Sequence, residues 1–166
     1  MTHRKMLCAF LCAAGTCGLL AAPVTASASD ATLRHTIKVF SPRILETEGR
    51  VETAVGEYKT TRKTAPVERA LASAVQVLRE LRKTIAGERA GSGSVREGKH
   101  KLEQGLMSVI IAYQHLEKAF RVKAANATAA KEQAQKADSA VKRGQQQLAE
   151  GIDLLNEPVK RHHVKA

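Results

Sequence analysis

The residues best suited to chemistry in this chain are its histidines and carboxylates, and their spacing builds no catalytic centre. Glu97 and His100 stand three positions apart, as in the Glu-x-x-His motif of di-metal carboxylate bundles. Such a site needs two of these motifs and further glutamates from other helices, whereas this sequence holds a single copy. The pair His162-His163 lies in a basic C-terminal stretch, where a frayed helix end is the simpler interpretation. We therefore expect no metal and no other cofactor.

Familiar catalytic signatures are also missing from the sequence. It contains no glycine-rich phosphate loop, no Gly-x-Ser-x-Gly elbow and no His-Glu-x-x-His motif. Its three cysteines are Cys8, Cys12 and Cys17, all close to the N-terminus. A chain that loses this segment has no cysteine nucleophile, thiolate metal site or disulfide. We expect a protein that is not an enzyme.

Positive charge is the strongest functional indication. Among 166 residues, 27 are Lys or Arg and 16 are Asp or Glu, which gives a net charge of +11. Such a protein suits anionic partners. Aromatic residues make up only 3% of the chain and there is no Trp, which argues against nucleic acid, because its binders usually add aromatic stacking platforms. The candidate contacts with an anionic partner are spread over the helices, several of them near helix ends: Lys99, Lys101, Arg121, Lys123, Lys142, Arg143, Lys160 and Arg161.

The first 28 residues read as an export signal. Arg4 and Lys5 precede an apolar run from Met6 to about Ala22, and Ala26-Ser27-Ala28 provides a small-x-small cleavage site. We predict cleavage before Ser29 and a secreted or periplasmic protein. An uncleaved anchor is the alternative, although Gly15, Gly18 and Pro23 would make it a short and weak span.

The rest of the chain shows helical spacing throughout. Apolar residues recur at steps of three and four in four segments, bounded by Leu33 and Tyr58, Val67 and Ile85, Val95 and Phe120, and Ala130 and Leu155. No segment alternates in the manner of a strand. The pattern predicts an all-α protein, an antiparallel up-down four-helix bundle spanning residues 29–158, with a basic C-terminal tail at 159–166.

At three positions in or between these segments the sequence bears on where a helix starts or ends. Pro42 predicts either a kink or a new helix start with Ser41 as its cap. Ser94 and Glu97 form a capping box for the third helix. Around Asn126 there is no Gly or Pro, so residues 95–157 could turn there or run on as one long helix.

A column of small residues favours the turn. At seven-residue spacing the third segment presents Gly-Gly-Ala-Ala and the fourth presents Ala-Ala-Gly-Gly, so a chain reversal between residues 124 and 125 places every small residue opposite another. Glycine inside a helix costs about 1 kcal/mol relative to Ala, and close backbone approach would offset that cost. The eight residues predicted to pack tightly are Gly98, Gly105, Ala112, Ala119, Ala130, Ala137, Gly144 and Gly151.

These observations predict an exported, non-enzymatic bundle that acts by surface contact. Its partner would be an anionic envelope polymer, a membrane surface or a protein, and a homodimer stays open. The alternative is a carrier of a small apolar ligand, held in a core cleft lined by Val55, Leu106, Tyr113 and Phe120.

Overall fold

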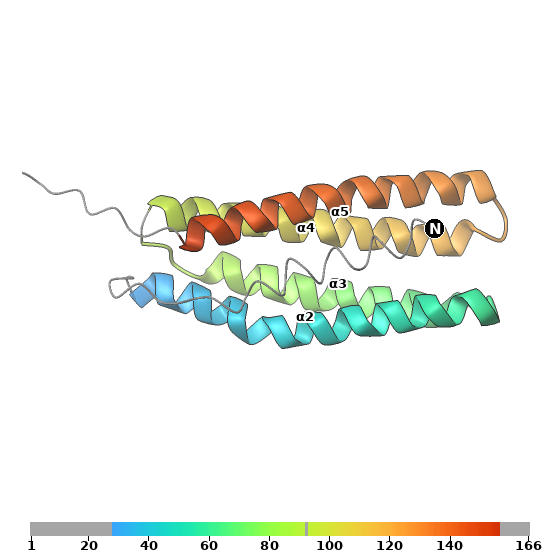
Figure 1. Cartoon of the computed structure of the whole chain (residues 1–166), viewed down its shortest axis with the longest axis horizontal. Coiled ribbons are helices and arrows are strands. Elements are labelled where there is room, and N and C mark those ends of the chain that lie inside the picture. The colour runs from blue at the N-terminus through green and yellow to red at the C-terminus, as the bar shows by residue number, and fades with distance from the viewer. Residues whose placement is uncertain (1–27, 92, 157–166) are drawn as a thin grey trace, which may run out of the picture.

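A computed structural model describes residues 28–91 and 93–156, which fold into four helices (Figure 1). These are α2 (Ala28–Thr61), α3 (Ala65–Gly87), α4 (Gly93–Val122) and α5 (Ala127–Asn156). No strand occurs among the described residues. The predicted all-α class is confirmed for this part of the chain, and its four helices are consistent with a four-helix bundle.

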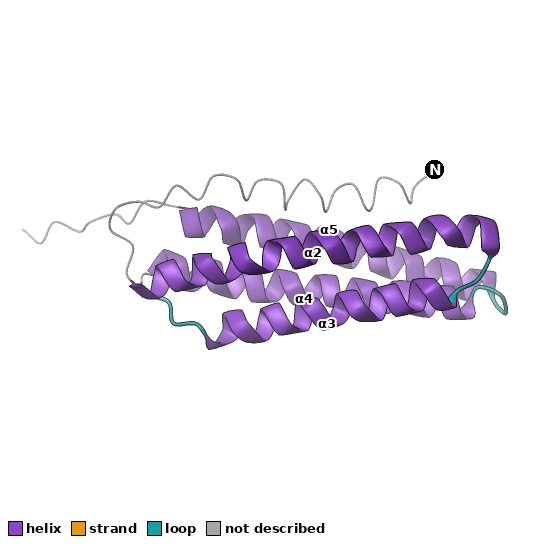
Figure 2. Cartoon of the chain, turned by 90° about the horizontal axis from the view of Figure 1, so that it is seen from below, coloured by secondary structure: helices purple, strands orange, loops and turns teal. Residues whose placement is uncertain are grey.

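The helices form two pairs that lie on each other as two layers. α4 and α5 make one layer and α2 and α3 the other, as Figures 1 and 2 show from two directions. The α2–α3 and α4–α5 turns lie at the same end of the molecule, and the α3–α4 connection lies at the opposite end. Two turns that are some sixty residues apart in the sequence are thereby neighbours in space.

Helix α3 shows most simply how the sequence produces this arrangement. Thr64 precedes its first turn and Pro66 stands inside that turn, where a missing backbone N–H costs nothing. Its predicted apolar stripe is buried in full and faces the other helices: Val67, Leu71, Val75, Leu78, Leu81 and Ile85. Helices with one apolar face pack in this way because burial of that face supplies most of their stability.

Of the two alternatives at Pro42, a new helix start at Ser41 is excluded, because α2 runs through Pro42 as one helix. Pro42 lacks a backbone N–H and so removes one hydrogen-bond donor from the helix. The residue lies on a part of α2 that is exposed to solvent. The Ser41 hydroxyl donates back to the Ile37 carbonyl at 2.9 Å, which is a bond within the helix and no cap of a new one. Burial of Leu33 before the proline and of Val51 after it holds both halves in one helix.

The chain reverses between α4 and α5, which excludes one long helix over residues 95–157. Asn126 closes the turn: its backbone N–H donates to the Val122 carbonyl at 2.8 Å, and its side-chain Oδ1 accepts from the Ala129 N–H at 2.9 Å. Asn126 is thus the N-cap of α5. At the other end of α4, the helix begins at Gly93, one residue before the expected cap Ser94.

The small residues of α4 and α5 meet across this reversal. A Cβ atom built on Gly98 would lie 2.9 Å from the Gly151 carbonyl oxygen, and one on Gly105 would lie 3.0 Å from that of Gly144. A Cβ atom built on Gly151 or Gly144 of α5 would lie at the same distances from the carbonyl oxygens of Gly98 and Gly105. The alanines of the column that are buried with them are Ala112, Ala119, Ala130 and Ala137. The two backbones therefore approach too closely for any side chain at the glycine positions.

The predicted signal segment and the basic tail lie outside the described residues, apart from Ala28, the first residue of α2. Among the helices that are described, none combines the length and the apolar character that crossing a membrane requires.

Candidate functional site

Several of the cations nominated from the sequence form hydrogen bonds or ion pairs within the bundle. The Lys99 ammonium donates to the carbonyls of Ala86 and Glu88 at 2.8 and 2.7 Å, which fastens the end of α3 to α4. Lys101 bridges to Glu150 of α5 at 2.7 Å, and this hydrogen bond raises the pKa of the lysine and lowers that of the glutamate. Lys142 pairs with Asp138 one turn earlier at 2.8 Å. These three residues are not brought together as one surface.

Arg121 and Lys123 lie together at the end of α4, against the other pair of helices. The Lys123 ammonium stands 4.9 Å from the centre of the Tyr58 ring of α2. Arg121 reaches Glu68 of α3 at 3.5 Å and also bonds Glu117 of its own helix. Below them the Tyr58 and Phe120 rings meet edge to face, with centroids 5.0 Å apart. These contacts join the α2–α3 and α4–α5 turns into one surface.

We call this surface the basic end. Residues 58–67 and 118–131 contain seven Lys or Arg and no Asp or Glu. The acidic residues nearest in sequence are Glu57, Glu68, Glu117 and Glu132, at its borders. Within the described part of the chain, Arg121 is the member that forms ion pairs with carboxylates. The cations of the basic end are Lys59, Arg62, Lys63, Lys118, Arg121, Lys123 and Lys131.

Arg62 occupies an unusual backbone conformation in this surface. It is the one described non-glycine residue with a positive φ, at 58°, and its N–H donates to the Tyr58 carbonyl at 2.9 Å. That is the left-handed residue that ends a helix, a position usually taken by Gly or Asn because a Cβ atom is disfavoured there. The side chain of Arg62 is exposed. The chain therefore carries a guanidinium at a place where backbone energetics favour glycine.

The opposite end of the bundle uses its polar groups internally. The buried Asp30 carboxylate accepts from the Gly91 N–H at 2.8 Å. The buried Arg34 guanidinium donates to the Leu155 carbonyl at the end of α5, at 3.2 Å from Nε. Thr36 donates to Glu88 at 2.9 Å. These bonds close α2 onto its neighbours.

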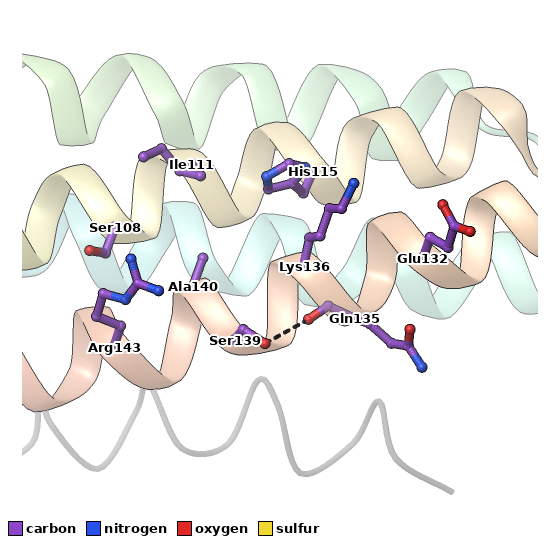
Figure 3. Close-up of a pocket in the computed structure, with 9 residues that line it drawn as sticks. All are labelled: Ser108, Ile111, His115, Glu132, Gln135, Lys136, Ser139, Ala140 and Arg143. Carbon is purple, nitrogen blue, oxygen red and sulfur yellow. Dashed lines mark hydrogen bonds between the residues drawn. The ribbon is translucent and has the colours of Figure 1, made fainter.

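A second candidate surface is the open groove between α4 and α5, of about 440 Å³ (Figure 3). Ile111 of α4 and Ala140 of α5 are among its lining residues, and Lys136 and Arg143 reach from α5 toward α4. Glu132 lies on the same lining, so the local charge is mixed. Of the nominated residues, Arg143 is the one that this groove uses.

The residues expected to line a core cleft are mostly packed. Leu106 and Tyr113 are buried in the core cluster, and Val55 and Phe120 pack against it. A cavity of about 270 Å³ instead lies beside Phe120, between the end of α4 and the start of α5. Lys123 and Lys131 stand at this cavity, next to side chains that are all apolar: Leu116, Ala119, Phe120, Ala127, Ala130 and Ala134.

Glu48 is a buried carboxylate that the sequence reasoning missed. Its side chain is only 6% exposed, and neither carboxylate oxygen has a hydrogen-bond partner in the described part of the chain. Burial raises its pKa from 4.5 to about 7. Burial, with the charge of Glu48 as a smaller cause, also raises the pKa of Tyr113. The sequence did indicate this burial, because Glu48 stands four residues after Ile44 and three before Val51, on the apolar face of its helix.

The histidines that the sequence singled out do not converge. His100 is exposed on α4 and contacts Gln104 at 2.8 Å, while His115 is half-buried with its Nδ1 2.8 Å from the Gln133 amide oxygen. Across the described residues, no group of three His, Cys, Asp or Glu side chains is placed to hold a metal ion. His162, His163, Lys160 and Arg161 lie outside the described residues.

Fold and surface together describe a small helical bundle in which seven cations, the basic end, lie at the α2–α3 and α4–α5 turns. Comparison with known proteins finds no matching family model, no matching curated relative and no matching solved structure.

Proposed function

We propose that this protein is an exported, non-enzymatic bundle that binds an anionic surface of the cell envelope through its basic end. The observation that carries the proposal is the gathering of seven cations and no acid in two turns that the fold makes neighbours. Cations grouped on one face attract anionic lipids by about 1 kcal/mol for each Lys or Arg at the surface.

The placement of Arg62 supports the same conclusion. A left-handed non-glycine residue costs of order 1 kcal/mol, and such strain concentrates at functional positions. At this turn the residue that bears the cost presents an exposed guanidinium. The mixed charge of the α4–α5 groove gives no comparable preference for an anion.

The test is sedimentation with vesicles, comparing phosphatidylglycerol mixed into phosphatidylcholine with phosphatidylcholine alone. We expect binding only to the anionic vesicles, and its loss as ionic strength approaches 1 M, where the Debye length falls to about 3 Å. Two triple variants remove the same charge: K59Q/K63Q/K123Q at the basic end and K136Q/K142Q/R143Q along α5. The first should bind roughly a hundredfold more weakly and the second nearly as tightly as the wild type.

Equal binding to both kinds of vesicle would overturn the proposal, and so would an equal loss in the two triple variants. The latter result would assign the effect to net charge alone. Salt-resistant capture by a protein, with no vesicle binding, would favour the protein partner that the sequence left open.

A further inference from the structure

We propose that the cavity beside Phe120 receives the chain of a single-chain anionic amphiphile, whose phosphate or carboxylate head lies against Lys123 and Lys131. This inference deepens the proposed function and rests on it, because the cavity opens within the basic end. It adds a bound lipid to what would otherwise be a purely electrostatic contact.

The cavity exists because the α4–α5 turn is lined by small side chains. Ala119 of α4 and Ala127, Ala130 and Ala134 of α5 surround it. Farther along the pair, glycines let the two backbones touch, and a Cβ has no room there. At the turn the alanines leave about 270 Å³ between the helices, and Leu116 and Phe120, which pack against the core, also line it.

The lining has the two-part chemistry of an amphiphile site. Its walls are aliphatic or aromatic carbon, and two lysines supply the polar groups that contribute charge. An apolar pocket with a few placed polar groups is the usual form of a small-molecule site. Lys123 belongs to the lining, and its ammonium is held over the Tyr58 ring, 4.9 Å from the ring centre.

The occupant follows from charge complementarity. A neutral apolar molecule would gain no electrostatic attraction from the two exposed lysines, and a bare phosphate would leave the apolar walls in water. An acyl or alkyl chain with an anionic head satisfies both parts. Its size is limited to one chain, because the volume lies below the usual range of about 300–1,000 Å³ for ligand pockets.

The experiment uses dodecyl phosphate as the probe, measured by titration calorimetry below its micelle concentration. Inorganic phosphate supplies the head without the chain, and dodecyl maltoside supplies the chain without the charge. We expect dodecyl phosphate to bind at least roughly tenfold more tightly than either.

Two variants fill the cavity and one serves as the matched control. A134L places a larger side chain on the lining, and A127L does so at its exposed edge, which keeps the test valid should A134L unfold. A149L makes the same change on an exposed face of α5 away from the cavity. Dodecyl phosphate binding should fall roughly tenfold in the first two and stay unchanged in the third.

Undiminished binding by both folded cavity variants would overturn the inference, as would equal affinity for inorganic phosphate. The proposed function is separable from it. If the wild type sediments with anionic vesicles while the cavity variants still bind dodecyl phosphate, the inference fails and the proposed function stands. If the cavity variants lose dodecyl phosphate but the wild type ignores the vesicles, the inference holds as a ligand site and the proposed function fails.

Discussion

The two helical pairs of this bundle carry the same kind of glycine and use it in opposite ways. In α4 and α5, Gly98 faces Gly151 and Gly105 faces Gly144, with no room for a Cβ atom. In α2, Gly49 and Gly56 repeat the seven-residue spacing, yet a Cβ built on either would meet nothing within 4 Å. Spacing alone therefore does not identify a packing glycine, because the residue opposite decides.

The core differs between the pairs in a similar way. The α4–α5 contact is made of backbone and small side chains in close approach. The α2 side of the core contains Glu48, a buried carboxylate without a hydrogen-bond partner among the described residues. The stability of the α4–α5 pair is thus limited by the space between its backbones, and that of the α2–α3 pair by the cost of burying the charge of Glu48.

The largest expected effect is the pH dependence that Glu48 imposes on stability. In the folded state its pKa is about 7, against an ordinary value of 4.5, so the folded protein holds this proton more tightly than the unfolded chain. The free energy of unfolding should therefore fall as the pH rises from 4.5 to about 7, and then level off. Glu48→Gln should be up to about 3 kcal/mol more stable than the wild type at alkaline pH and similar to it under acidic conditions.

Urea unfolding across this pH range measures the effect, with the exposed neighbour Glu52→Gln as control. A wild-type profile that Glu48→Gln leaves unchanged would mean that this carboxyl is not buried in solution.

The next effect tests the close approach of α4 and α5. Gly98→Ala should lower the free energy of unfolding by about 2 kcal/mol, since its Cβ would stand 2.9 Å from a backbone oxygen that can move only with α5. Thermal and urea unfolding measure it. A neutral or stabilising result would contradict the packing and leave ordinary helix propensity as the account of Gly98.

The two turns offer a smaller contrast. Asn126 caps α5 through its side chain, whereas Thr64 precedes α3 without a side-chain cap bond. Asn126→Ala should cost about 1 kcal/mol, and Thr64→Ala should cost clearly less. Equal losses in urea unfolding would show that the two turns do not differ in this respect.

The smallest effect has the opposite sign. Gly49→Ala should stabilise the protein by about 0.8 kcal/mol, because the added methyl meets open space and Ala is the better helix former. Gly56→Ala should behave alike. If either variant were destabilised in the same unfolding assay, α2 would have a close neighbour at that position.

Much of the fold could be predicted from apolar spacing, and the reasons for the exceptions are physical. The stripe of α3 reads directly from the sequence, because Thr64, Pro66 and six apolar positions agree. Pro42 left open a kink or a new helix start, and the new start did not occur, since burial on both sides outweighs one lost donor. The turn at Asn126 had a local signal in the asparagine itself, a preferred N-cap residue.

The candidate site was less predictable. Arg121 and Lys123 were nominated from the sequence, but their partners Lys59, Arg62 and Lys63 lie some sixty positions earlier and join them only through the fold. Lys99 and Lys101 looked equivalent in the sequence and are used within the bundle, because carbonyl and carboxylate acceptors lie beside them. Whether a surface cation forms an ion pair or hydrogen bond within the bundle depends on its tertiary neighbours, which composition does not reveal.

The central claim is that the basic end is the surface that meets the anionic partner. Amide hydrogen exchange, followed by mass spectrometry with and without phosphatidylglycerol vesicles, tests it most directly. We expect the vesicles to slow exchange at the two turns, residues 58–67 and 118–131, and to leave the far end near Arg34 and Leu155 unchanged. Protection confined to the groove around Lys136 and Arg143, or no protection anywhere, would contradict it.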